Sequence, residues 1–265
     1  MTDVAGHMIT PGAWPSPVGA WPDPPWRMTG RMVTGYFDLP WSVLNEITHP
    51  DFLPKDEKST VPSRVRFYEL NSVGHTFREA VIGSPVHYEG IDGESTFVIW
   101  TDSEIYQTWG REVFGWPILR GGISFSGALW NPKISTGATG TCQVECRDGE
   151  IVLDVDSGLE ETSADSEWRL TRSDWLCPRR VVCPGSPGNS AHKVVRITPT
   201  VEQPGCSFTT SGHVSFRFTP GHPLARLGEI GVDVEVIDGF EMIVGDHVDL
   251  VGTYRGIRPP EEAAG

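Results

Sequence analysis

The chain has 265 residues, of which 38% are hydrophobic, 10% aromatic and 21% charged, a composition typical of soluble globular proteins. Its formal net charge of −14 repels phosphate backbones and anionic lipid surfaces, so we expect no nucleic-acid partner and no membrane association. Only four of the 21 basic residues are lysines, namely Lys55, Lys58, Lys133 and Lys193. Chemistry that needs an amine therefore has few candidate side chains.

The length favours one β-rich domain, residues 30–258, with an N-terminal arm of residues 1–29 and a disordered tail of residues 259–265. The arm is rich in proline and holds Trp14, Trp21 and Trp26. We expect irregular backbone there, with indoles that dock on the body or on a neighbouring subunit, which favours a homo-oligomer. Neither a signal-peptide pattern nor a membrane-spanning apolar run occurs, so we expect a cytoplasmic protein.

Short apolar or alternating runs separated by turn residues predict an α+β fold, a mostly antiparallel β barrel or cone with a few helices. The expected strands cover residues 31–38, 64–70, 86–88, 95–100, 142–146, 151–155, 232–237 and 249–254. A further hairpin is expected from Cys206 to Phe218, with its turn at Ser211 and Gly212. Short helices are expected at residues 41–47 and 224–227.

The clearest local pattern is a strand that leads into a helix. Residues 95–100 form a continuous apolar run, typical of a strand buried on both faces. Asp102 is positioned to cap a helix whose apolar stripe runs from Ile105 to Val113 and which ends at Gly115.

Common cofactor and metal motifs are missing from the sequence. The five cysteines form no C-x₂-C pair, and no histidine lies at ligand spacing from a second histidine and a carboxylate. Phosphate-binding loops, dinucleotide fingerprints and common hydrolase motifs are also missing. We therefore expect free thiols, no metal and no cofactor.

Residues 110–122 read Gly-Arg-Glu-Val-Phe-Gly-Trp-Pro-Ile-Leu-Arg-Gly-Gly. This segment resembles the signature of the acetoacetate decarboxylase superfamily, in which Gly-Arg-Glu precedes Pro-Lys-Lys. The upstream order also agrees, because Glu79 stands six residues before Pro85 and two strands follow. The resemblance runs over residues 33–254 and is strongest over 77–122. It implies a barrel or cone around a central cavity, a small-molecule substrate and self-association.

The same resemblance implies a change in chemistry. In the superfamily the first lysine after the proline forms a Schiff base with the substrate ketone, and the second lysine lowers its pKa. Ile118 and Leu119 occupy these two positions here, and an aliphatic side chain cannot form an imine. The position of the arginine that receives the substrate carboxylate holds Tyr36, which offers only one hydrogen bond. The sequence therefore predicts a divergent member without the Schiff-base lysine. Lys133 is the leading candidate among the four lysines for a relocated one.

Glu79 matches a glutamate that lines the family's pocket. An apolar lining should raise its pKa toward neutrality, which suits a general acid or base that works with Tyr36. A purely structural hydrogen bond is the alternative for Glu79, and a helix-end ion pair is the alternative for the adjacent Arg111 and Glu112. The expected substrate-binding residues are Arg111, Glu112, Trp116, Ile118, Leu119 and Arg120.

Three functions follow as hypotheses. The first is an enzyme without a Schiff base that cyclises, dehydrates or isomerises an apolar carbonyl or polyketide-like metabolite in secondary metabolism, such as antibiotic biosynthesis. The second is a β-keto acid decarboxylase in which Tyr36 or Arg111 stabilises the oxyanion. The third is a non-catalytic small-molecule binding protein.

Overall fold

The computed structural model describes residues 24–52, 59–130, 138–162, 174–181, 191–203 and 205–252. Most of the expected arm and the whole tail lie outside the described residues. So do Trp14, Trp21, Cys183 and three of the four lysines, Lys55, Lys58 and Lys133. No helix in the described ranges is long and apolar enough to cross a membrane.

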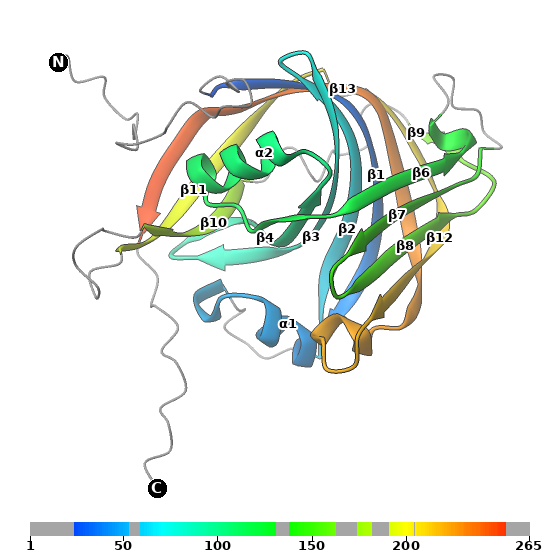
Figure 1. Ribbon diagram of the computed structural model, residues 1–265, viewed down its shortest axis with the longest axis horizontal. Helices are drawn as coiled ribbons and strands as arrows, with labels where there is room; N and C mark the ends of the chain where they lie inside the picture. The colour runs from blue at the N-terminus through cyan, green and yellow to red at the C-terminus, as the bar shows by residue number, and fades with distance from the viewer. Residues whose placement is uncertain are drawn as a thin grey trace, which may run out of the picture.

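Seven of the described strands close into a barrel (Figure 1). They follow the order β1-β2-β3-β4-β10-β11-β13, and β13 pairs back onto β1. All neighbours in this ring are antiparallel except β4 and β10, which are parallel. The strands are β1 (Trp26–Pro40), β2 (Thr60–Ser72), β3 (His75–Tyr88), β4 (Ile91–Thr101), β10 (Asp174–Val181), β11 (Ala191–Gln203) and β13 (Glu229–Gly252).

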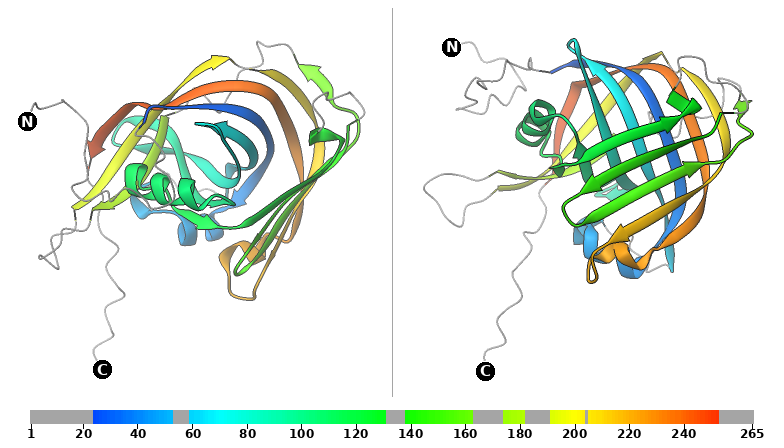
Figure 2. Two further views of the ribbon diagram at one scale, coloured as in Figure 1. Left: turned by 45° about the horizontal axis from the view of Figure 1, so that its top comes forward. Right: turned by 45° about the vertical axis from the view of Figure 1, so that its right-hand side comes forward.

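A second group of strands continues from the first half of β13 and covers one wall of the barrel. Its order is β12-β8-β7-β6, and Figure 2 shows it lying across β1, β2 and β3. These strands are β12 (Cys206–Phe218), β8 (Gly149–Val155), β7 (Gly140–Cys146) and β6 (Gly122–Gly127). Two short strands complete the sheet: β9 (Glu160–Thr162) pairs with β12, and β5 (Ile118–Arg120) pairs with β4.

The shared wall has an apolar layer on each face, because side chains alternate along a strand. Val33, Phe67 and Ile82 face the covering sheet and pack in one cluster with residues of β7 and β8. Met32 and Val81 face the barrel interior and belong to a second cluster. The wall is therefore buried on both sides, and the barrel interior is a separate compartment from the core between the sheets.

A short helical segment covers the barrel interior from one side. α2 (Glu104–Trp109) runs into a π-helical turn, η2 (Gly110–Phe114). Tyr106 and Phe114 are buried, and the ring of Trp26 packs on both, with centroid distances of 6.1 and 5.0 Å. The other short elements are α1 (Trp41–Ile47), η1 (Pro50–Phe52), η3 (Ala128–Trp130) and η4 (Pro223–Arg226).

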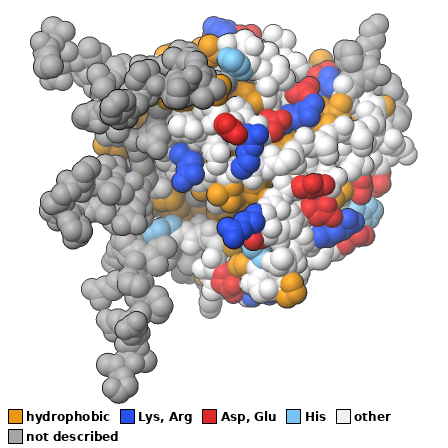
Figure 3. Space-filling model, viewed as in Figure 1, with side chains coloured by type: hydrophobic (Ala, Val, Ile, Leu, Met, Phe, Trp, Pro, Cys, Tyr) orange, Lys and Arg blue, Asp and Glu red, His pale blue; other side chains and the backbone are white. Residues whose placement is uncertain are grey.

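The predicted fold class is confirmed, since the chain is mostly strands with few helices in a large mixed sheet. Helix 41–47 and the hairpin of strands 142–146 and 151–155 also form as expected. Cys142, Cys146, Cys177 and Cys206 are free thiols. On the face shown in Figure 3, acidic and basic side chains lie intermingled over the described surface.

Several local predictions were wrong. Ser103, not Asp102, caps α2 and accepts a hydrogen bond from the Tyr106 backbone N–H, whereas the Asp102 carboxylate accepts from the Arg78 N–H at 2.8 Å. Residues 206–218 form the continuous strand β12 rather than a hairpin, because β8 and β13 pair with it on its two sides through Ser211 and Gly212. The two strands expected at 232–237 and 249–254 are one 24-residue strand, β13. Residues 26–29, inside the segment expected to be irregular, belong to the regular strand β1.

Candidate functional site

A small cavity lies inside the barrel, under α2 and the Trp116 segment. Its volume is about 40 Å³. The lining is mainly apolar and aromatic and includes two ionisable residues, Arg66 and Glu79. The lining residues are Met28, Arg66, Tyr68, Leu70, Glu79, Val81, Thr96, Ile99, Tyr106, Trp116, Trp175 and Met242. This lining, apolar with a few polar groups, is the usual chemistry of a small-molecule site. The volume is below the roughly 300–1,000 Å³ usual for such sites, so a ligand larger than water requires the lining side chains to move.

Unpartnered polar atoms gather on this cavity. Buried polar groups in native proteins are almost always hydrogen-bonded, so an exception needs an explanation. Among the described residues, nine buried side-chain atoms have no hydrogen-bond partner, and three of these residues line the cavity: Arg66 through Nε, Glu79 through Oε1 and Trp175 through Nε1. Two donors and one carboxyl oxygen are thus available to a bound molecule.

Glu79 is the titratable group of the cavity whose pKa is brought close to neutrality. It lies on β3, and 5% of its surface is exposed. Burial raises the pKa of Glu79 to about 8; the hydrogen bond with the Tyr106 hydroxyl opposes this rise, and the charge of Asp102 adds to it. The carboxyl is therefore mostly protonated at neutral pH, and a modest change of pH or ligand can ionise it.

Arg66 reaches the cavity from β2 as part of a buried charge cluster. The Glu94 carboxylate is fully buried and forms ion pairs with both Arg64 and Arg66. The pKa of Glu94 is lowered, because the two guanidinium groups outweigh the effect of burial. Arg66 also hydrogen-bonds to the Tyr68 hydroxyl, and it lines the cavity whereas Arg64 does not.

Tyr36 lies on the interior face of β1, outside the cavity lining. Its hydroxyl donates to Glu235 Oε2 at 2.7 Å, and the Ser207 hydroxyl donates to Glu235 Oε1 at 3.0 Å. Burial, followed by the charge of Glu235, raises the pKa of Tyr36. The structure does not bring Tyr36 and Glu79 together as a proton-transfer pair.

The signature segment contributes one wall of the cavity. Trp116 lines it, and Ile118 is buried in the same interior cluster. Gly110 is needed beside them, since a Cβ there would lie 2.3 Å from Ile118 Cδ1. The side chains of Arg111, Leu119 and Arg120 are exposed and do not line the cavity, and the side chain of Glu112 lies outside the described part of the structure.

Sequence reasoning missed Arg66, Tyr68, Tyr106 and Trp175. The pattern in β2 held a usable signal, because Arg64, Arg66 and Tyr68 alternate with the apolar Val65 and Phe67. Such alternation in a strand flanked by apolar runs indicates polar side chains that share one buried face. No lysine lines the cavity among the described residues, and Lys193 on β11 lies elsewhere.

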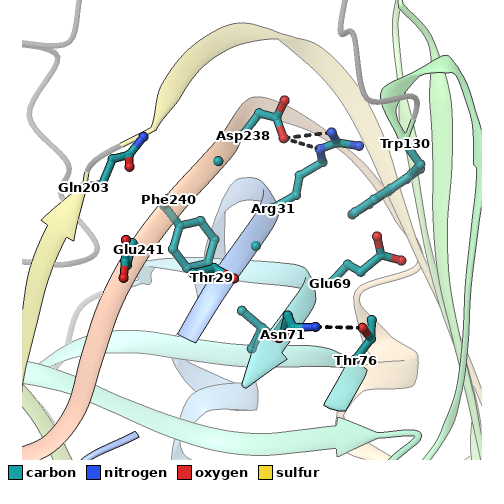
Figure 4. Close-up of a pocket in the computed structure, with 13 residues that line it drawn as sticks. Thr29, Arg31, Glu69, Asn71, Thr76, Trp130, Gln203, Asp238, Phe240 and Glu241 are labelled. Carbon is teal, nitrogen blue, oxygen red and sulfur yellow. Dashed lines mark hydrogen bonds and ion pairs between the residues drawn. The ribbon is translucent and has the colours of Figure 1, made fainter. Parts of the chain in front are cut away.

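A wider cleft of about 500 Å³ lies at the rim of the barrel (Figure 4). Its polar groups are largely engaged with one another: Arg31 is paired with Asp238, and Asn71 donates to Thr76. Leu70 borders both this cleft and the interior cavity. The cleft is larger and includes one residue with an unpartnered buried atom, Trp130 through Nε1, but the interior cavity has three such residues and the carboxyl with the shifted pKa, and it is therefore the candidate site.

The raised pKa of Glu79 predicts a pH-dependent stability. The contribution of Glu79 to the unfolding free energy is fully present below pH 4.5, where its side chain is protonated in both the folded and the unfolded chain. It falls as the pH rises above 4.5, because the unfolded chain then ionises first, and it is lost once the pH passes about 8. Relative to Glu79→Gln, the wild-type chain should lose about 2–4 kcal/mol of unfolding free energy between pH 4.5 and pH 8.5. Urea unfolding of both proteins across this range measures the difference. If the unfolding free energies of the two proteins changed in parallel with pH, the raised pKa of Glu79 would be contradicted.

Glu94 predicts a second stability effect. Glu94→Gln leaves two buried guanidinium groups without their counter-charge, so we expect a loss of about 3–5 kcal/mol in unfolding free energy. Glu150→Gln is the control, because Glu150 pairs with the exposed Arg217 and should cost about 1 kcal/mol or less. Equal effects of the two substitutions would show that the Glu94 cluster does not stabilise the barrel.

No protein-family model matches the sequence, and no curated protein sequence is significantly similar to it. Solved structures do match. The enduracididine biosynthesis enzyme MppR with HEPES buffer bound superposes with a TM-score of 0.68 at 18% identity, over 90% of this chain and 92% of that chain. MppR complexed with the condensation product of pyruvate and imidazole 4-carboxaldehyde superposes with a TM-score of 0.69 at 16% identity, over 90% of this chain and 94% of that chain.

Acetoacetate decarboxylase from Legionella pneumophila superposes with a TM-score of 0.67 at 16% identity, over 92% of this chain and 94% of that chain. The structural neighbours are thus acetoacetate decarboxylase and acetoacetate decarboxylase-like enzymes. At these identities the likeness establishes the fold. The resemblance noted in the sequence is confirmed at that level.

Proposed function

We propose that this chain is an enzyme that moves protons on an apolar carbonyl compound without forming a Schiff base. The reactions in this class are isomerisation, dehydration and cyclisation. The observation that carries the proposal is Glu79, a buried carboxyl with a pKa of about 8 that lines an apolar cavity and has one oxygen without a hydrogen-bond partner among the described residues. Neighbours such as MppR, a biosynthesis enzyme, support an enzymatic role.

Glu79 acts as the base and then as the acid. Its ionised form takes a proton from the carbon next to the substrate carbonyl, and the electron pair of that C–H bond moves onto the carbonyl oxygen as an enolate. The resulting carboxylic acid then returns the proton, to a different carbon in an isomerisation or to a leaving hydroxyl in a dehydration. The Tyr106 hydroxyl holds the carboxyl in place, so that Oε1 is left to work on the substrate.

The lining favours non-covalent chemistry. Ile118, at the position where the family carries its reactive lysine, packs into the interior cluster with an aliphatic side chain. Trp116, Tyr106 and Trp175 surround the cavity with aromatic surface, which suits an apolar substrate and excludes water. A longer substrate would extend past Leu70 toward the rim cleft.

Proton exchange on a small ketone tests the proposal. We expect the protein to exchange the α-protons of butanone or cyclopentanone for deuterium in D₂O, followed by ¹H NMR. The rate should rise with pH and level off above about pH 8, as Glu79 ionises. Glu79→Gln should slow the exchange about 100-fold or more, since a positioned general base contributes that much.

Two controls accompany this experiment. Glu150→Gln removes a carboxylate on β8, in the covering sheet, and should leave the exchange unchanged. Borohydride treatment in the presence of ketone, followed by intact-mass measurement, should give no adduct. Exchange at the background rate, full activity of Glu79→Gln, or a trapped adduct on a lysine such as Lys133 would each contradict the proposal.

A further inference from the structure

We infer that Arg66 is the oxyanion-stabilising residue of this cavity, and that the ligand it takes is an enolate, with the negative oxygen of the enolate placed on the guanidinium group. The inference rests on the proposed function, because the enolate is the species that Glu79 generates. In this role Arg66 stabilises the negative charge on the carbonyl oxygen, so that no imine is needed to take up the electron pair.

Position supports this assignment. Arg66 and Glu79 line the same cavity from the neighbouring strands β2 and β3, and Tyr68 pairs directly with Glu79 between these strands. Arg66 is 3% exposed, and its Nε has no hydrogen-bond partner among the described residues. A buried guanidinium N–H without a partner costs free energy, so it is a site that a ligand oxygen would satisfy.

Charge supports it as well. Glu94 carries one negative charge and divides it between Arg64 and Arg66, so this buried cluster has a net charge of +1. The next interior carboxylate, Glu235, lies two strands away across Thr34, and it accepts from Tyr36 and Ser207. Glu79 is mostly neutral at pH 7. The cluster that reaches the cavity through Arg66 is thus positive by itself, and Glu235, which is engaged with Tyr36 and Ser207, balances it only from two strands away.

Tyr68 adds a second donor at the same place. Its hydroxyl hydrogen-bonds to Arg66, and the pKa of Tyr68 is raised by burial, so the hydroxyl keeps its proton. A hydroxyl oxygen that accepts from a guanidinium can donate its own proton to a ligand. Preorganised donors in a water-excluded site stabilise developing negative charge far better than they would in water.

Acetylacetone provides a direct probe. It is a small 1,3-diketone, and its enolate is distinguished from the neutral form by ultraviolet absorption. We expect the enolate fraction of bound acetylacetone at pH 7 to rise at least tenfold over its value in solution. Intact-mass measurement after the titration should show no covalent adduct, which separates a bound enolate from a lysine derivative.

Arg66→Lys and Arg64→Lys form a matched pair. Both replace a buried arginine that pairs with Glu94, but only Arg66 lines the cavity. Arg66→Lys should reduce the enolate gain to twofold or less, because lysine lacks the Nε–H and the planar fork of donors. Arg64→Lys should retain most of it. An equal loss in both variants would overturn the assignment to Arg66.

If Arg66→Lys does not fold, acetylacetone binding to the wild-type chain still tests the inference. No gain in enolate on binding, or no binding of acetylacetone up to 100-fold excess over protein, would overturn the inference. The enolate gain is an equilibrium property of binding, whereas deuterium exchange measures proton transfer by Glu79, so a chain that gains enolate without exchanging protons contradicts only the proposed base. Failure of Arg66 and failure of the proposed base therefore give different results.

Discussion

Polar groups enclosed by the barrel must find their partners inside it, and this constraint shapes the rest of the structure. β13 closes the ring of strands by pairing with β1, and α2 with its π-helical turn covers the interior. Glu94 meets the constraint by pairing with two arginines. Glu79 has no cationic partner among the described residues and meets the constraint by remaining protonated, and burial therefore brings its pKa near neutrality.

The predictable part of the molecule is the part set by local patterns. Helix 41–47 follows Pro40, and the hairpin around Asp148 and Gly149 carries a strong turn signal, so both formed as expected. The signature segment was recognisable because a tight packing requirement fixes it: Gly110 leaves room for Ile118, and Gly115 adopts the left-handed conformation that ends the π-helical turn.

The less predictable part depends on which strands meet. Arg66 and Tyr68 lie beside Glu79 because β2 pairs with β3, whereas Tyr106 on α2 and Trp175 on β10 reach Glu79 only through the packing of the barrel. The length of β13 was hidden for a similar reason, since its two halves pair with different neighbours. The role of Asp102 was misread because its carboxylate bonds a backbone N–H on β3, far away in sequence.

The central claim is that the Glu79 carboxyl stays neutral in the folded protein up to about pH 8. Carbon-13 NMR of the chain labelled at glutamate side-chain carboxyls measures this directly, with Glu79→Gln identifying the resonance. The Glu79 resonance should titrate near pH 8, well above the pKa of about 4.3 of a free glutamate side chain. A Glu79 resonance that titrates in the range of a free glutamate side chain would contradict a neutral carboxyl.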